Sequence, residues 1–396
     1  MGARPRVVVG GFLGLLPAGG VTWDYLQYPL GFAELGCDVF YIEDTRLWPI
    51  YQNGGGGGGD CSANVAHLGA VMDAFGLAGR WAYRDEVSGR CFGLAEREVR
   101  DVCRGADVFV NLSCSTFMRD EYRAIPVRVL IDTDPMFTQI QYVTQTAFTS
   151  GKPGLRDLVE AHSHLFTFGE QVGEPECRIP ACGREWHPTR QPICLDYWRV
   201  TELPPRAEAA YTTVMNWSAA PPLQYDGELW GQKNVEFLRI MALPSHLPHI
   251  RLAVAVGQTM GVPFPQDEAR ARGWTVLQAE QCVPNWSMYR DFIERSLGEF
   301  SVAKQTYVRG RTGWFSCRSA CYLASGRPVV AQDTGWTRYL PSGRGLLAFE
   351  NAATAAEALA CVDADLSKHA RAARRLAAEH FASEVVLGEL LREVGG

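Results

Sequence analysis

Short apolar segments typical of β-strands alternate along the chain with segments typical of helices, and this pattern occurs twice. It runs from residue 6 to about 168, stops in a loop-rich stretch around 201–209, and restarts at 211. Strands that alternate with helices predict parallel sheets with helices on both faces. Because 396 residues are also too many for one ordinary core, the sequence predicts two α/β domains.

The first half opens with one complete strand–loop–helix–strand unit. Arg6–Val9 is a short β-branched run that ends in glycines. Thr22 is predicted to cap a helix that stops at Gly36, and Asp38–Ile42 is predicted as the next strand. Further predicted elements of this half are a helix at Ser62–Phe75 and strands at Ala106–Asn111, Arg128–Ile131 and His164–Phe168. Between them, the six glycines Gly54–Gly59 predict a flexible loop.

The second half repeats the alternation. Its predicted strands are Tyr211–Met215, Ile250–Val256, Trp274–Leu277, Glu299–Ala303 and Pro328–Ala331. Its predicted helices are Asn234–Ala242, Met288–Leu297, Ser316–Ser325, Ala352–Ala360 and one alanine-rich stretch from Leu366 to Val394. We therefore expect domains at 1–205 and 206–375 with a cleft between them, and a C-terminal helix at 376–396 that packs back on the N-terminal domain.

Composition excludes several classes of protein. A formal net charge of −6 argues against a general nucleic-acid binder. The apolar stretch 6–16 is broken by glycines, so neither a signal peptide nor a membrane span is expected. The twelve cysteines are scattered, which is typical of reduced thiols in a cytoplasmic protein.

One group of metal-binding residue types lies close together in sequence. Cys177, Cys182 and His187 follow His162 and His164. Their Cys-x4-Cys spacing is wider than a usual zinc knuckle, and no second knuckle follows. We therefore predict structural thiols and no metal site.

The segment from residue 304 to 330 carries the strongest chemical signal. It predicts a loop with glycines and arginines that leads into a helix capped by Ser316. A helix N-terminus offers unpaired N–H groups to an anion, and arginines add charge-assisted hydrogen bonds. A solvated basic loop above an ordinary crossover is the alternative interpretation. The residues predicted to hold a diphosphate here are Arg309, Arg311, Thr312, Gly313, Ser316, Arg318 and Ser319.

The end of this segment resembles a known family. Leu323–Val330 reads Leu-Ala-Ser-Gly-Arg-Pro-Val-Val, and Asp333-Thr-Gly follows. This is similar to the C-terminal domains of GT-B glycosyltransferases, especially the "group 1" (family 4-like) class. The resemblance implies two Rossmann-like domains facing across a cleft and a nucleotide-sugar donor. It departs from the family at Gly313 and Cys321, where the usual glutamates would fall.

Two further segments are similar to the same family. Similar enzymes place a lysine on the donor diphosphate after the first strand of the second domain, which implies this role for Lys233, with Asn216 and Gln232 orienting the donor. An exposed lysine at a helix start is the alternative for Lys233. In the first domain, residues 19–39 look like the first loop and helix of GT-B acceptor domains. Asp24 lies there, where inverting GT-B enzymes often hold their base.

Asp132 and Asp134 are a second candidate for acid–base chemistry. Both follow a predicted strand, and two close carboxylates can raise one pKa toward neutrality. An Asp-x-Asp-Pro turn is the alternative. The Asp-x-Asp pattern also occurs in metal-dependent GT-A enzymes, but the two-domain pattern does not match them.

These residues favour one function and leave alternatives open. The favoured function is a metal-independent glycosyltransferase that moves a sugar from a nucleotide-diphosphate donor to a small-molecule hydroxyl without a cofactor. The alternatives are a catalytically silent GT-B-like binding or auxiliary protein, for which the missing glutamates argue, and a nucleotide-sugar epimerase. An NAD site is disfavoured because Gly10, Gly11 and Gly14 lack the Gly-x-Gly-x-x-Gly spacing.

Overall fold

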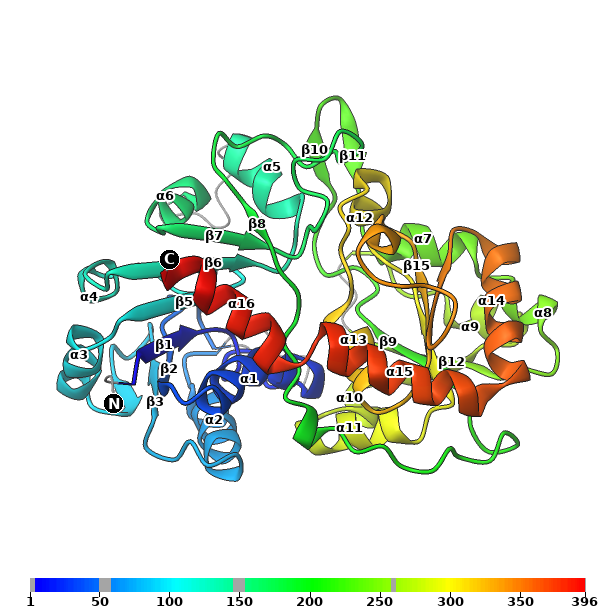
Figure 1. Cartoon of the computed structure of the whole chain (residues 1–396), viewed down its shortest axis with the longest axis horizontal. Coiled ribbons are helices and arrows are strands. Elements are labelled where there is room, and N and C mark those ends of the chain that lie inside the picture. The colour runs from blue at the N-terminus through cyan, green and yellow to red at the C-terminus, as the bar shows by residue number, and fades with distance from the viewer. Residues whose placement is uncertain (1–3, 50–57, 145–153, 258–260, 396) are drawn as a thin grey trace.

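The chain folds into two lobes, each built on a parallel sheet (Figure 1). The computed structural model describes residues 4–49, 58–144, 154–257 and 261–395. Most of the six-glycine run, residues 54–57, lies outside this part. The two sheets confirm the predicted α/β class, and we propose that the domain boundary near 205 lies in the connection between them.

The N-terminal lobe contains an eight-stranded sheet in the order β4-β3-β2-β1-β5-β6-β7-β8. All neighbouring strands are parallel except β3 and β4. Its strands are β1 (Arg6–Gly10), β2 (Asp38–Glu43), β3 (Trp81–Arg84), β4 (Cys91–Gly93), β5 (Val108–Leu112), β6 (Val127–Asp132), β7 (His164–Thr167) and β8 (His187–Pro188). Its helices are α1 (Gly19–Glu34), α2 (Ser62–Ala74), α3 (Glu96–Arg104), α4 (Asp120–Arg123), α5 (Phe137–Thr144) and α6 (Leu155–Glu160). Consecutive valines at 7–9 are fully buried because helices cover both faces.

The C-terminal lobe contains a six-stranded parallel sheet in the order β13-β12-β9-β14-β15-β16. Its strands are β9 (Tyr211–Met215), β12 (Leu252–Val256), β13 (Thr275–Gln278), β14 (Gly298–Ser301), β15 (Val329–Gln332) and β16 (Leu346–Phe349). A hairpin of β10 (Leu223–Tyr225) and β11 (Glu228–Trp230) projects from it. Its helices are α7 (Lys233–Arg239), α8 (Leu243–His246), α9 (Gln266–Ala271), α10 (Ala279–Cys282), α11 (Trp286–Glu294), α12 (Gln305–Gly310), α13 (Cys317–Ala324), α14 (Ala352–Ala364) and α15 (Leu366–His380). The predicted loop after residue 304 therefore begins with a short helix, α12.

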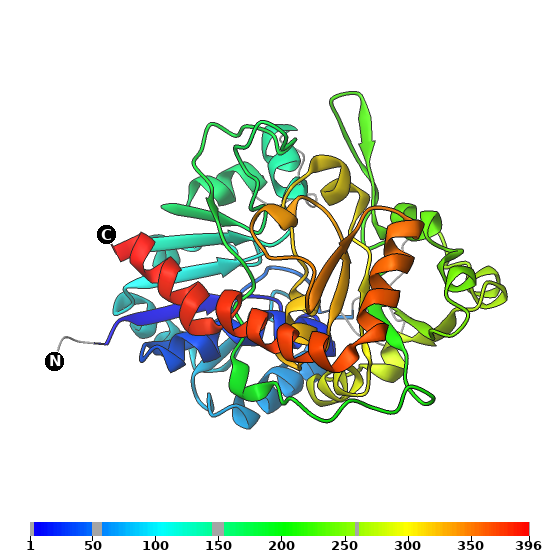
Figure 2. The same ribbon diagram turned by 45° about the vertical axis from the view of Figure 1, so that its right-hand side comes forward.

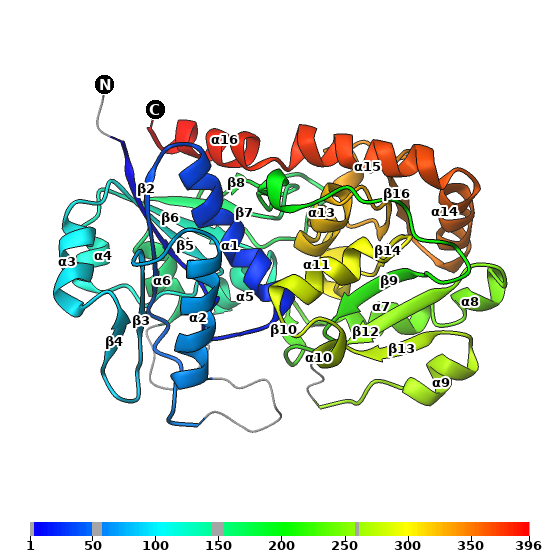
Figure 3. The same cartoon turned by 90° about the horizontal axis from the view of Figure 1, so that it is seen from below.

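Helix α1 starts earlier than predicted. Its N-cap is Ala18, and the Thr22 hydroxyl donates to the Ala18 carbonyl at 2.9 Å, so Thr22 is not the cap. The extra turn docks on the other lobe, since a Cβ at Gly19 would lie 2.4 Å from the Asn285 carbonyl oxygen before α11. This close approach brings the start of α1 to the boundary between the lobes (Figure 3).

The prediction of one helix over 366–394 is wrong. The chain forms α15 and then α16 (Ser383–Gly395), and Figure 2 shows both running from one lobe to the other. The break arises because Ile193 donates to the Phe381 carbonyl at 2.7 Å and accepts from Ser383 N–H at 2.9 Å, which diverts these groups from helical bonding. Beyond the break, α16 lies on α1, where Ser383 Oγ donates to Glu34 Oε2 at 2.6 Å.

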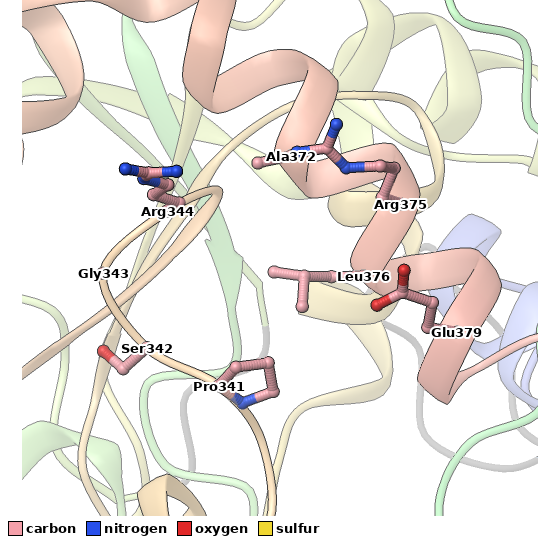
Figure 4. Close-up of a pocket in the computed structure, with 8 residues that line it drawn as sticks. All are labelled: Pro341, Ser342, Gly343, Arg344, Ala372, Arg375, Leu376 and Glu379. Carbon is pink, nitrogen blue, oxygen red and sulfur yellow. The ribbon is translucent and has the colours of Figure 1, made fainter.

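The loop before β16 lies beside α15, and Figure 4 shows the pocket that Gly343 and Arg344 of this loop line together with Ala372 and Leu376 of α15. Gly345 has a φ of +78°, and a Cβ there would lie 2.4 Å from the backbone nitrogen of Ala373.

Gly345→Ala is expected to lower the free energy of unfolding by about 3 kcal/mol, since the backbone strain at positive φ and the steric overlap with Ala373 add. Gly343→Ala is the matched control, with a φ of +115° and nothing within 4 Å. Its loss is expected to be about 1 kcal/mol in denaturant titrations, and equal losses would contradict the packing argument.

Candidate active site

A cavity of about 510 Å³ lies between the two lobes. The N-terminal lobe contributes α1 and the loops that follow β1, β2, β5 and β6, and the C-terminal lobe contributes α7, α12 and the start of α13. Carboxyl ends of parallel strands are where open α/β sheets bind ligands. The surface pocket of Figure 4 is of similar size but lies at the amino end of β16, so it lacks this placement.

Asp24 lies on the second turn of α1 and lines this cavity. Burial raises its pKa to about 7, against the opposing effects of the Arg318 and Lys233 charges. Among the described residues, none donates a hydrogen bond to the Asp24 carboxylate. A carboxyl group with a pKa near neutrality and open oxygens can take up a proton from a bound hydroxyl.

Lys233 is the first residue of α7 and lines the same cavity from the other lobe. Burial lowers its pKa well below the usual value, and the neighbouring Arg318 and Lys304 charges add to this effect. No carboxylate in the described part of the chain forms an ion pair with it. The protein therefore holds a lysine amino group in the cavity whose charged form is disfavoured in the free protein, and an anionic ligand would stabilise that charged form.

Asp134 joins the two lobes across the cavity. Its carboxylate accepts hydrogen bonds from Lys304 Nζ and Tyr307 Oη of the C-terminal lobe. Burial opposes ionisation, but the Lys304 charge and both hydrogen bonds hold the Asp134 pKa below its usual value. Beside it, Trp314 Nε1 donates to the Thr133 carbonyl at 3.1 Å. Asp134 is thus an ionised anchor for Lys304.

Asp132 is buried beneath this loop and does not line the cavity. Its oxygens accept from Thr138 Oγ1 at 2.6 Å, Gln139 Nε2 at 2.9 Å and Thr167 Oγ1 at 2.8 Å. Burial raises its pKa, although these three bonds favour the ionised form. The carboxylate organises the turn that presents Asp134.

The predicted arginines are engaged elsewhere. Arg309 pairs with Glu228 and lies over the Trp230 ring at 4.8 Å, whereas Arg311 lies 3.5 Å from Glu176. Neither lines the cavity. Arg318 pairs with Glu299 of β14 and does not line the cavity. Its charge still acts on Asp24 and Lys233.

The loop before α13 is buried and closely packed. Thr312 is fully buried, and Gly313 adopts a φ of +76° where a Cβ would lie 2.7 Å from the Gln171 nitrogen. A glutamate at position 313 would therefore strain this contact between the lobes. Ser316 is the N-cap of α13 but makes no side-chain capping bond, and Ser319 Oγ is buried without a protein partner in the described structure.

The predicted donor residues Asn216 and Gln232 do not line the cavity. Asn216 is exposed at the end of β9, where its Oδ1 would lie 2.7 Å from a Cβ at Gly257. Gln232 is buried as the N-cap of α7, and its carbonyl accepts from Gln305 N–H at 3.3 Å. Of the predicted site residues, the cavity thus brings together Asp24, Asp134 and Lys233.

Several cavity residues were not predicted. They are Tyr25, Arg46, Arg123, Lys304, Tyr307, Trp314 and Cys317, among others. One sequence signal could have identified Lys304: the chain has only four lysines, and two of them, Lys233 and Lys304, line this cavity.

The cysteine and histidine group does not form a cluster. His187 lies 3.3 Å from Glu393, and Cys182 packs in an apolar cluster with Trp186. Among the described residues, no three histidine, cysteine or acidic side chains are placed to share a metal ion. Within that same part of the chain, no helix has both the length and the apolarity needed to cross a bilayer.

Comparison with known proteins identifies the fold. No protein-family model matches the sequence, and no curated protein is detectably similar to it. Solved structures do match over the whole chain. An α-glucosyltransferase in complex with UDP and a 13-mer DNA containing a HMU base superimposes with a TM-score of 0.60 at 11% identity, covering 100% of both chains.

Two further matches agree with it. AviGT4, a glycosyltransferase involved in avilamycin A biosynthesis, gives a TM-score of 0.55 at 13% identity and covers 99% of this chain and 97% of its own. Sucrose-phosphate synthase from Thermosynechococcus elongatus gives 0.52 at 10% identity, covering 98% and 99%. The chain therefore has the GT-B fold, as the resemblance of its C-terminal motifs implied. At these identities, the likeness shows the fold alone.

Proposed function

We propose that this protein is a metal-independent glycosyltransferase that moves a sugar from a nucleotide-diphosphate donor to a hydroxyl group of a small molecule. One observation carries the proposal: Lys233, which forms no ion pair with a described residue, and Asp24, a carboxyl group of near-neutral pKa, line one cavity from opposite lobes. Such a pair can neutralise a leaving group on one side of a sugar and accept a proton on the other.

On the donor side, Lys233 binds the diphosphate together with the amino end of α13, where Cys317 lines the cavity. Lys304 can turn from Asp134 to a phosphate oxygen, because both lie on the cavity wall. Arg318 does not line the cavity, but its positive charge acts on Asp24 and Lys233. We assign Thr312, Gly313, Ser316 and Ser319 to shaping the loop, and Asn216, Gln232, Arg309 and Arg311 to the surroundings of the donor.

On the acceptor side, Asp24 accepts the proton of the attacking hydroxyl. The acceptor oxygen forms a bond to the anomeric carbon, and the bond from that carbon to the diphosphate oxygen breaks. The electron pair leaves with the diphosphate, where the Lys233 charge stabilises it. Asp132 supports this step only through the turn that carries Asp134 and, with it, Lys304.

The first test is thermal unfolding of the purified protein with UDP, GDP, TDP, ADP or NAD. A ligand present at about 100 times its Kd adds about 2.7 kcal/mol to the stability of the native state, which is readily seen as a rise in Tm. We expect one nucleoside diphosphate to raise the Tm. A rise with NAD alone would contradict the donor site, and no rise at millimolar ligand would favour the silent GT-B-like protein. Turnover of the sugar donor without any acceptor would favour the epimerase.

A further inference from the structure

The part of the cavity in the N-terminal lobe has a distinct lining. Its walls are mostly apolar and come from α1, from α6 and from the loops after β1, β2 and β5. The apolar side chains are Phe12, Leu16, Val21, Leu47, Phe117, Met118, Leu155 and Leu158. Among the described residues, Asp24 and Asp134 are the carboxylates that line the cavity, and neither forms an ion pair with Arg46 or Arg123. An apolar molecule would be bound here by burial of its surface.

Arg46 carries one positive charge into this lining. It follows β2 in the left-handed region, with a φ of 52°, and its guanidinium lies 3.6 Å from the centroid of the Phe117 ring. The ion pair with Glu86 is long, at 3.9 Å, and both side chains are more than one third exposed. The atom of this pair, Arg46 Nε, is buried and has no hydrogen-bond partner among the described residues. At 3.9 Å the pair is too long for a hydrogen bond, so most of the guanidinium's hydrogen-bonding capacity stays open.

Arg123 carries a second positive charge and lines the same cavity. It ends α4, and its Nε donates to the Met118 carbonyl at 3.0 Å. No carboxylate in the described part of the chain forms an ion pair with it. Since Arg46 contacts Phe117 and Arg123 contacts Met118, the two guanidinium groups hold adjacent residues of one loop.

Two other arginines of the N-terminal lobe differ from Arg46 and Arg123 because they pair with a buried carboxylate. Arg84 and Arg119 both pair with the buried Asp44, at 2.9 and 2.5 Å. The fold thus neutralises two arginines of this region internally and leaves Arg46 and Arg123 on the cavity. Guanidinium groups bind carboxylates in a planar, bidentate manner, which fits an anionic ligand.

We infer that the acceptor is a hydroxylated aromatic acid, with its ring between the apolar walls and its carboxylate on Arg46 and Arg123. This inference rests on the proposed function and names the acceptor class of the same site. The hydroxyl group at the other end of the ring then faces Asp24. A neutral analogue would bury the same ring but offer no carboxylate to either guanidinium group.

The test is isothermal titration of the protein with p-coumarate and with its neutral methyl ester, without nucleotide. We expect the acid to bind at least about tenfold more tightly than the ester, as charge-assisted hydrogen bonds allow. Arg46→Gln and Arg123→Gln should each bring the acid to within about threefold of the ester. Arg97→Gln is the matched control. This substitution removes the same charge, and Arg97 lies on α3 with 93% of its side chain exposed.

A second measurement uses the unmodified protein, so that it does not depend on how the variants fold. Raising NaCl from about 50 to 500 mM should weaken binding of the acid and leave binding of the ester unchanged. Equal affinities for acid and ester, or affinities that both ignore salt, would overturn the carboxylate assignment. If neither probe binds, the aromatic-acid inference is wrong. The nucleotide panel tests the donor site separately. Failure of both aromatic probes to bind would therefore leave the proposed function standing.

Discussion

Asp24→Asn is expected to lower turnover by about 10² to 10⁴-fold, the range typical of losing a general base. Asparagine keeps the shape of the side chain and its place on α1 but cannot accept the proton. Affinity for the nucleoside diphosphate should change little, because the nearby cations that bind it stay in place. Steady-state rates at saturating donor would measure the first effect and calorimetric titration of the nucleotide the second. Unchanged turnover would remove Asp24 from the mechanism.

The pH dependence follows from the same group. The Asp24 pKa is raised from 3.8 to about 7, so the base is active only when the pH exceeds about 7. Activity should therefore rise with pH through that value, and Asp24→Asn should lose this inflection. Glu236→Gln is a control for loss of a carboxylate: Glu236 is buried on α7 and does not line the cavity.

The contribution of Asp24 to the stability of the fold should fall as the pH rises, whereas activity should rise. Between the unfolded pKa near 4 and the folded pKa near 7, the native state binds a proton that the unfolded state has released, so Asp24 lowers stability as the pH rises. Asp24→Asn is then expected to raise the free energy of unfolding at pH 8 by on the order of 1–3 kcal/mol, with little effect at pH 4. Denaturant titrations at both pH values would measure this. A destabilised variant at pH 8 would indicate that Asp24 is structural.

The fold could be predicted because its signals are local. Tyr211–Met215 is one such segment: a run of strand-forming residues after a loop-rich stretch, which forms β9 with the bounds expected. Valines at 7–9 are consecutive, as expected for a strand covered on both faces. The break between α15 and α16 could not be predicted, because Ile193 causes it from about half the chain away.

The residues of the site were harder to predict, because their hydrogen-bond and ion-pair partners determine which side chains reach the cavity. Arg309 and Lys304 belong to one segment. Arg309 forms an ion pair with Glu228 of the hairpin and does not line the cavity, whereas Lys304 forms an ion pair with Asp134 and does line it. Likewise, Asp132 and Asp134 differ by two residues. The first meets three buried donors, and the second meets a lysine from the other lobe. Residue type and spacing reveal neither outcome, since each depends on contacts between segments that are far apart in sequence.

Lys233→Ala is expected to raise the Kd of the nucleoside diphosphate by about 10 to 100-fold, as loss of a charge-assisted contact in a buried site predicts. Turnover should fall as well, because the same charge stabilises the departing diphosphate. Calorimetric titration would measure the affinity. Lys368→Ala is the matched control, because Lys368 is exposed on α15. An unchanged Kd would place the diphosphate elsewhere.

The pKa of Lys233 provides a second readout that a merely structural lysine would not give. Burial lowers this pKa in the free protein, so the charged group costs stability until an anion arrives. Binding of a diphosphate should raise the pKa and take up protons at a pH where free Lys233 is partly neutral. Titrations in two buffers with different ionisation enthalpies would detect this uptake, and Lys233→Ala should abolish it. Because Lys233→Ala removes a group whose charge is costly in the free protein, the variant should be at least as stable as the unmodified protein. Weaker binding would then reflect the lost contact rather than a damaged fold.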